Sequence, residues 1–179
     1  MKDNEYNNDY ISELEIKVLN ELQKNCRANL EDIGKKCGCS RYKIGRIIKK
    51  FEDNKTIIGY SAIINPKKIN LKHYLLLVKR TNVPLDDSII KKLPINIVSD
   101  LLPDYEVDIN LQDTFYLHGN YDWISTFTAD DISKAKEYAN QILKYFYKFV
   151  EKVDLLETVR PIRINGFIIP HDKSVPELI

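Results

Sequence analysis

A tight turn at Gly38-Cys39-Ser40 constrains the fold of this 179-residue chain more than any other feature. Asn29 is a favourable N-cap for a helix over residues 30–37, and Gly38 stands where a left-handed C-cap is expected. Ser40 is a new N-cap only two residues later. Two short helices joined by so short a turn are typical of a helix-turn-helix.

An earlier helix is expected at the start of this region. Ser12 and Glu15 have the spacing of a capping box, in which each side chain binds the other residue's free backbone N–H. Apolar residues then recur at helical spacing. They are Leu14, Val18, Leu19 and Leu22. In the helix after Asn29, the expected apolar face is Leu30, Ile33 and Cys37.

The helix after the turn has two distinguishable faces. One face is apolar and is expected to pack on the first two helices through Ile44, Ile48 and Phe51. The other face and its flanks carry Ser40, Arg41, Tyr42, Lys43, Gly45, Arg46, Lys49 and Lys50. We predict that Tyr42, Gly45 and Arg46 face base edges, while the other cations contact phosphate. An ordinary amphipathic surface helix is the alternative interpretation.

The distribution of charge supports a nucleic-acid partner, although the net charge of the whole chain is only +1. Residues 1–73 carry 15 basic and 10 acidic side chains, a net charge of +5. Residues 74–179 carry 12 basic and 16 acidic side chains, a net charge of −4. Such asymmetry between halves indicates a basic DNA-binding part joined to a part with another role.

The period of the sequence changes after residue 55, and the rest reads as alternating strands and helices. A strand is expected at residues 56–64, as a wing or hinge, and further strands at 74–80, 107–117, 123–128, 153–159 and 162–169. A short helix is expected from Pro84 to Pro94, and a longer one is capped by Asp130 or Asp131. Its apolar stripe is Ile132, Ala135, Tyr138, Ala139, Ile142, Leu143 and Phe146.

This order of elements predicts the fold class and the domains. It is α+β, with an N-terminal winged helix-turn-helix joined to a ferredoxin-like αβ sandwich of βαββαβ order. We predict a polar tail at 1–10, a DNA-binding domain at 11–64, a linker at 65–72, a ferredoxin-like dimerisation domain at 73–170 and a tail at 171–179. Because the helices of such a fold cover one sheet face, we expect a homodimer through the other face.

The chain resembles the Lrp/AsnC (leucine-responsive, feast/famine) regulators from about Ile11 to Pro170. The resemblance is carried by Ile33-Gly34, Gly38-Cys39-Ser40, Arg46, Ile57-Ile58-Gly59-Tyr60, Asn65-Pro66 and Gly119-Asn120-Tyr121-Asp122. It implies a RAM-type effector and assembly domain, binding to partly palindromic double-stranded promoter DNA, a homodimer that assembles to a tetramer or octamer, and an amino-acid effector. Gly119, Tyr121 and Asp122 are the implied effector-binding residues; a simple tight turn is the alternative.

Three positions depart from the family pattern in the DNA-binding half. Cys39 replaces a Leu, and Ile47 stands where an Arg is common, which removes one phosphate contact. Lys55 replaces a Gly after the recognition helix, so we expect Asn54 to supply the left-handed residue. The stretch 95–114 matches the family poorly.

Other classes of protein are less favoured. Siroheme decarboxylase subunits resemble the same family, but the Arg pair typical of them is missing at residues 57–64. An effector-binding module that no longer binds DNA is a third alternative. No apolar run is long enough to span a membrane, and three crowded cysteines favour a reducing, cytoplasmic compartment. We therefore expect no enzyme activity, no cofactor, no metal and no membrane partner.

Overall fold

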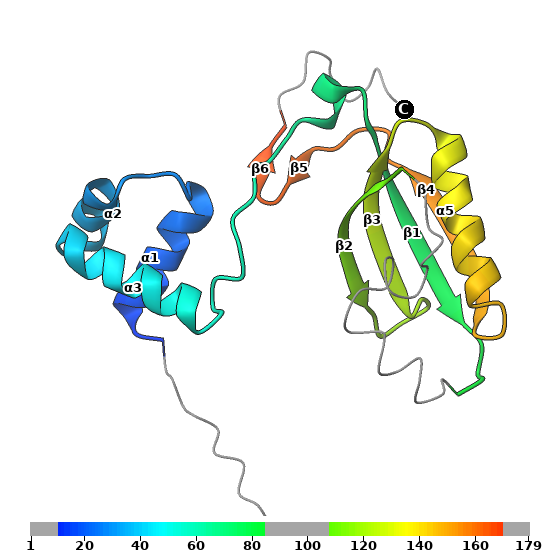
Figure 1. Ribbon diagram of the computed structural model, residues 1–179, viewed down its shortest axis with the longest axis horizontal. Helices are drawn as coiled ribbons and strands as arrows, with labels where there is room; N and C mark the ends of the chain where they lie inside the picture. The colour runs from blue at the N-terminus through cyan, green and yellow to red at the C-terminus, as the bar shows by residue number, and fades with distance from the viewer. Residues whose placement is uncertain (1–10, 85–107, 170–179) are drawn as a thin grey trace, which may run out of the picture. The chain divides into compact units, whose positions relative to one another are not determined.

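The computed structural model describes residues 11–84 and 108–169, and the chain divides into two compact units between Ala62 and Ile63. The N-terminal unit consists of α1 (Glu13–Lys24), α2 (Leu30–Cys37) and α3 (Arg41–Asp53), shown in blue to cyan in Figure 1. Within the described residues, no helix is long and apolar enough to cross a membrane.

The three helices begin where the sequence predicts. Ser12 and Glu15 make both bonds of the capping box, and the side chains of Asn29 and Ser40 accept backbone N–H groups at the starts of α2 and α3. Gly38 ends α2 in the left-handed region, with φ of 71°. The core between the helices contains Val18, Leu22, Ile33, Ile44, Ile47 and Phe51.

Two residues differ from their expected positions in this core. Ile47, which was not included in the expected apolar face, is only 8% exposed and packs inside, whereas Ile48, which was included, is only partly buried. Leu30 was expected inside but is 39% exposed. It is the first residue of α2, so it lies at the rim of the helix bundle, where the neighbouring helices cover it only in part.

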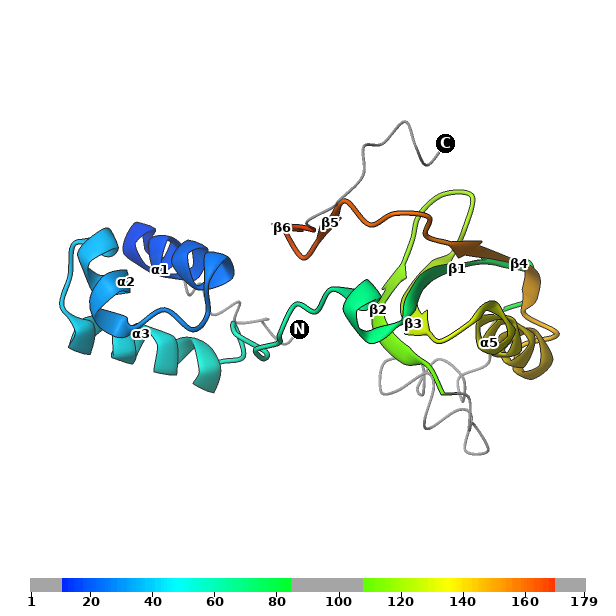
Figure 2. The same cartoon turned by 90° about the horizontal axis from the view of Figure 1, so that it is seen from above.

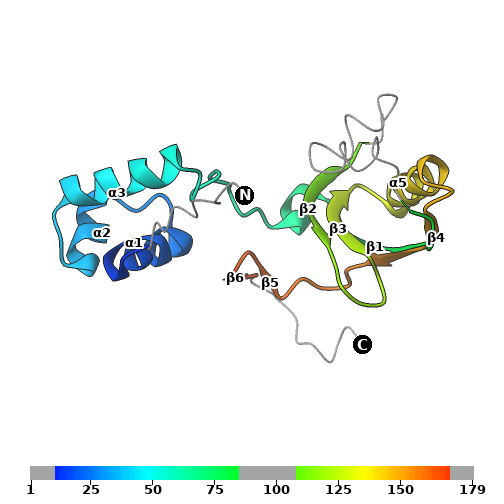
Figure 3. The same ribbon diagram turned by 90° about the horizontal axis from the view of Figure 1, so that it is seen from below.

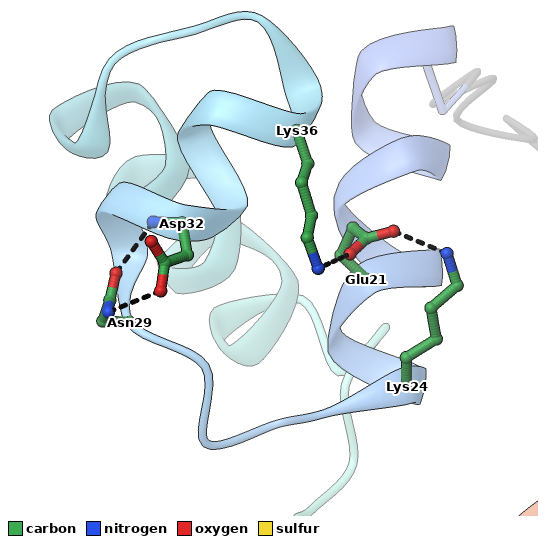
Figure 4. A network of polar contacts seen from close by, with 5 residues as sticks. All are labelled: Glu21, Lys24, Asn29, Asp32 and Lys36. Atoms are coloured by element: carbon green, nitrogen blue, oxygen red, sulfur yellow. Dashed lines mark hydrogen bonds and ion pairs between the residues drawn. The ribbon is translucent and has the colours of Figure 1, made fainter.

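A polar network also joins α1 to α2. Glu21 on α1 accepts from Lys24 one turn along, at 2.6 Å, and from Lys36 on α2, at 2.8 Å (Figure 4). Only 15% of the Glu21 side chain is exposed. These two ammonium groups lower the pKa of the Glu21 carboxyl. Two of the basic side chains counted in the sequence therefore serve the fold.

The segment after α3 corrects two expectations. The left-handed residue is Lys55 (φ 62°), not Asn54 (φ −90°), because the position after the C-cap is the one that takes this conformation. Residues 56–64 form no strand, because no described strand pairs with them. Ile58 is 93% exposed, while the Tyr60 hydroxyl donates to Glu52 on α3 at 2.9 Å.

The second unit is an antiparallel sheet with a helix on one face. After η1 (Pro66–Ile69), the strands β1 (Lys72–Arg80), β2 (Asn110–Tyr116), β3 (Trp123–Ala129) and β4 (Val150–Glu157) pair in the order β2-β3-β1-β4. This is the strand order of a ferredoxin-like sheet, and it confirms the predicted fold class. Figures 2 and 3 show α5 (Ile132–Tyr145) along one face. The expected helix at 84–94 and both tails lie outside the described residues, apart from Pro84 itself.

The core of this unit lies between the sheet and α5. Tyr74, Leu76 and Val78 of β1 are fully buried there, with Trp123, Phe127, Ala135, Tyr138 and Ile142. Asp131 is the N-cap of α5, as one of the two predicted alternatives. Leu143, expected in the apolar stripe, is 38% exposed, because it follows the buried Ile142 and so lies about 100° further round the helix.

Three strand boundaries differ from the prediction. β2 carries an irregularity between Leu111 and Asp113, which breaks the alternation on which the prediction depended, and it ends at Tyr116. β4 begins earlier than expected and ends earlier. The expected strand at 162–169 is a small hairpin of β5 (Arg163–Ile164) and β6 (Phe167–Ile168), because Asn165 and Gly166 both take positive φ in a tight turn.

Candidate nucleic-acid interface

The turn between α2 and α3 depends on a close approach of two backbone segments. A Cβ placed on Gly34 would lie 2.6 Å from the carbonyl oxygen of Cys39, so only glycine fits at that position. The Gly34 carbonyl in turn accepts the backbone N–H of Cys39 at 2.9 Å. Cys39 itself is partly buried against the core. This packing fixes the direction in which α3 leaves the turn.

The exposed side of α3 carries the residues that the sequence assigns to DNA. Tyr42 is 72% exposed, and the side chains of Lys43, Arg46 and Lys49 are exposed as well. Among the described residues, no hydrogen bond or ion pair is found for the side chain of Arg46 or Lys43. Both cations are therefore available to an anionic partner without loss of an internal contact.

Arg41 is held in a fixed position beside this face. Its guanidinium lies 3.2 Å from the Glu31 carboxylate of α2 and 5.0 Å from the centre of the Tyr42 ring. It also donates to the Tyr42 hydroxyl at 3.2 Å. Cation–π contact and ion pairing together orient Arg41 and Tyr42 as one group. The sequence predicted both residues, but not their pairing.

Two of the predicted residues are also used by the fold. Ser40 caps α3 through its side chain, which accepts the backbone N–H of Lys43 at 3.4 Å. The Lys50 ammonium donates to Glu15 of α1 at 2.9 Å, and only 12% of the Glu15 side chain is exposed. Hydrogen bonds from Lys50 and from the Ser12 backbone lower the pKa of Glu15 to about 2. Lys49 lies 3.7 Å from Asp53 in an exposed pair.

An open hollow of about 610 Å³ lies between the start of α2 and the exposed side of α3. Gly45 borders it, with Leu30 and Tyr42 as apolar neighbours and Arg41, Arg46 and Lys49 as cationic ones. A Cβ on Gly45 would lie 3.6 Å from Leu30 Cδ1, an ordinary contact, so the protein itself does not require glycine there. Sequence reasoning did not assign Leu30 or Glu31 to the surface beside α3. The position of Leu30 at the start of a helix was the available signal that its side chain could be exposed.

The predicted effector residues lie together in the connection between β2 and β3. The Tyr121 hydroxyl donates to Asp154 at 2.6 Å, and Asp122 accepts the backbone N–H of Arg80 at 2.7 Å. The hydrogen bond to Asp154 raises the pKa of Tyr121. A Cβ on Gly119 would meet no atom within 4 Å. The Asp122 carboxylate thus supports the turn through one of its oxygens.

Comparison with known proteins defines the class of the N-terminal unit. The profile of a winged helix-turn-helix DNA-binding family matches residues 11–58. The leucine-responsive regulatory protein of Haemophilus influenzae is 35% identical over 63 residues, which are 35% of this chain and 38% of that protein. The matched stretch therefore spans less than half of that relative.

Solved structures extend the likeness to both units. A transcriptional regulator from Neisseria meningitidis in complex with L-Met has a TM-score of 0.65 at 17% identity, with 89% of this chain and 96% of that chain covered. An AsnC family transcriptional regulator from Agrobacterium tumefaciens has a TM-score of 0.64 at 20% identity, over 89% and 96%. The resemblance to the Lrp/AsnC regulators that the sequence predicts is confirmed.

Proposed function

We propose that this protein is a transcriptional regulator of the Lrp/AsnC type that binds promoter DNA in a sequence-specific manner. The observation that carries the proposal is the exposed side of α3, where Arg46 and Lys43 have no described partner and Tyr42 is 72% exposed. α3 is fixed behind them by its N-cap and by the close approach at Gly34. A helix of this kind can enter the major groove while its apolar face stays packed.

The mechanism separates base contacts from phosphate contacts. Arg46 is proposed to bind a guanine through its O6 and N7 atoms, with Tyr42 and Gly45 beside it at the base edges. Arg41, Lys43, Lys49 and the N-terminal end of α3 at Ser40 are proposed to contact phosphate. Lys50 reaches DNA only if it exchanges Glu15 for phosphate, because the two side chains are already paired.

The experiment that tests the proposal is selection of genomic DNA fragments by the purified protein. We expect an enriched, partly palindromic motif, and binding whose log affinity falls with log salt by about 0.9 per phosphate contact. Fragments bound without a shared motif would contradict sequence-specific regulation. An absorbance titration with siroheme, run in parallel, tests the enzyme alternative; we expect no spectral change.

We propose further that the protein acts as a homodimer through the open face of its sheet. Leu75, Leu77 and Ile124 lie on the face opposite α5, and Phe115 and Leu156 on the same face are 55% and 47% exposed. We expect a dimer by light scattering, converted to monomer by Phe115→Asp with Leu156→Lys. Leu143→Lys on α5 is the matched control and should leave the dimer intact. A wild-type monomer would contradict the proposal.

An amino-acid effector is the last part of the proposal. It is supported by the residue pattern Gly119, Tyr121 and Asp122, and by one neighbour's having been solved with L-Met. A thermal-shift screen of the common amino acids should find at least one that raises the unfolding temperature, and Tyr121→Phe should reduce that shift. If no amino acid causes a shift, these residues form a structural turn only.

A further inference from the structure

The hollow beside Gly45 has a chemical character that differs from the rest of the DNA-facing surface. Part of its lining is apolar: Leu30 is 39% exposed, Tyr42 contributes an aromatic ring, and Gly45 offers only backbone. Arg41, Arg46 and Lys49 supply cations at its borders, and the Glu31 carboxylate among them is neutralised by Arg41 at 3.2 Å. An apolar depression bordered by cations suits an apolar group carried on a polyanion.

We propose that this hollow receives the 5-methyl group of a thymine in the major groove, so that the protein reads a T·A pair beside the base bound by Arg46. This inference rests on the proposed function. Of the groups that base pairs present in the major groove, the thymine methyl is the apolar one, whereas the others are hydrogen-bond donors or acceptors. Leu30 and Gly45 carry no side-chain donor or acceptor, so they match that group and no other.

The geometry at Gly45 explains why a helix-interior glycine stands at this point. A Cβ at that position would occupy the space next to Leu30 Cδ1, at 3.6 Å, which is the space a methyl group would take. Glycine in a helix interior costs roughly 0.5–1 kcal/mol relative to alanine. The protein core gives no reason for this cost, since nothing forbids the Cβ. Admission of a base methyl provides one.

The test removes the methyl group from DNA without any other change. In the motif recovered by genomic selection, each thymine is replaced in turn by deoxyuridine, which differs from thymidine only by the 5-methyl. We expect one thymine per half-site at which affinity falls about fourfold, the effect of one buried methyl. Replacement of the same base by cytosine should weaken binding more, and 5-methylcytosine should restore about fourfold of that loss.

The matching protein variant is Leu30→Ala, which removes an apolar wall of the hollow. Because Leu30 is 39% exposed at the rim of α2, the variant should remain folded, with a modestly lowered unfolding temperature. The ratio of thymine to deoxyuridine affinity should fall from about four toward one. Lys43→Ala is the control, since Lys43 does not border the hollow. It should weaken both duplexes equally.

The outcomes separate this inference from the proposed function. If genomic selection yields no motif, the proposed function itself is overturned. If a motif is bound tightly but every duplex with deoxyuridine binds as well as the duplex with thymine, the DNA-binding function stands. The proposal that the hollow receives a thymine methyl group is then overturned. A thymine preference that persists unchanged in Leu30→Ala would place the methyl contact elsewhere on the protein and overturn the assignment to this hollow.

Discussion

The two units of this chain use their charged and apolar residues in opposite ways. In the N-terminal unit, each of the three helices contributes apolar side chains to the core, while Lys43 and Arg46 remain exposed on α3 beside Tyr42. In the sheet unit, Asp154 is bound by Tyr121 and Lys152, and Lys134 by Asp108 and Asp130. The residues left exposed there include apolar ones, Phe115 and Leu156.

This difference indicates which kind of partner each unit is suited to bind. Exposed cations on a rigid helix suit a polyanion, and their affinity for it depends on salt. Exposed apolar side chains on a sheet face suit a protein surface, and a second copy of the same face is self-complementary in apolar character. The two units can thus bind different partners without competition for the same residues.

The largest expected effect tests whether the units are independent. Gly34→Ala should lower the stability of the N-terminal unit by about 2–3 kcal/mol, because the new Cβ would meet the Cys39 backbone oxygen. Far-ultraviolet circular dichroism of the helices should register the loss. Trp123, the one tryptophan of the chain, is buried in the sheet unit. The unfolding midpoint measured by its fluorescence should therefore not change.

Gly45→Ala is the matched control for Gly34→Ala. Its Cβ would make only an ordinary contact, so stability should be unchanged or rise by up to about 1 kcal/mol. If Gly34→Ala lowers both midpoints together, the units are coupled and the comparison between them fails.

The next effect tests whether the exposed cations serve binding only. Arg46→Ala should remove about 1–3 kcal/mol of discrimination at one base position per half-site, measured by titration of DNA variants. Its free energy of unfolding should stay within about 0.5 kcal/mol of wild type, as is usual for surface substitutions. Arg27→Ala, an exposed cation outside α3, controls for net charge. Equal weakening on all sequences would make Arg46 a phosphate contact instead.

A smaller effect separates structural from binding cations through pH. The Glu15 pKa is about 2 in the folded state against 4.5 when unperturbed. The contribution of ionised Glu15 to the stability of the fold is therefore complete above pH 4.5. The contribution is lost as pH falls from 4.5 toward 2, and we expect about 1 kcal/mol after solvent screening. Glu15→Gln should flatten this part of the stability profile, whereas Glu13→Gln should not. An unchanged profile in Glu15→Gln would show that the Lys50 pair does not stabilise the fold.

The smallest effect concerns the end of α3. Lys55→Gly should stabilise the N-terminal unit by about 1 kcal/mol, because glycine takes a positive φ without the steric cost of a side chain. Asn54→Gly should bring no gain, since Asn54 has a negative φ and its side chain accepts the Thr56 backbone N–H at 3.1 Å. Urea unfolding of both variants measures the difference; a larger gain from Asn54→Gly would contradict the assignment.

Features decided by neighbouring residues could be predicted from the sequence, and features decided by distant ones could not. The caps at Ser12, Asn29 and Ser40 involve residues within three positions, so their patterns identified the helix starts correctly. By contrast, the exposure of Leu30 depends on how the three helices pack together, which involves residues far apart in the sequence. The hairpin at residues 163–168 is the exception: it is local and Asn165-Gly166 is a strong turn signal, but the apolar residues on both sides were interpreted as one strand.

The candidate site also divides into features decided by neighbouring residues and features decided by distant ones. The sequence predicts candidate site residues on one helix, where helical periodicity groups them. It did not predict the pairing of Lys50 with Glu15, because 35 positions separate the two. The same holds for Glu31 and Leu30, which border the hollow beside Gly45 from α2. Sequence periodicity therefore identifies a face, while the contacts of that face with other elements require the fold.

The place of β1 in the sheet has a consequence for how the chain is made. β1 lies between β3 and β4, both of which follow it in the sequence, so its backbone cannot be paired until the C-terminal part of the chain exists. The helices of the N-terminal unit need only local contacts, which form quickly. We expect refolding to show an early helical phase and a later Trp123 phase. During synthesis, the apolar strand 74–78 would wait exposed beside an already folded DNA-binding unit.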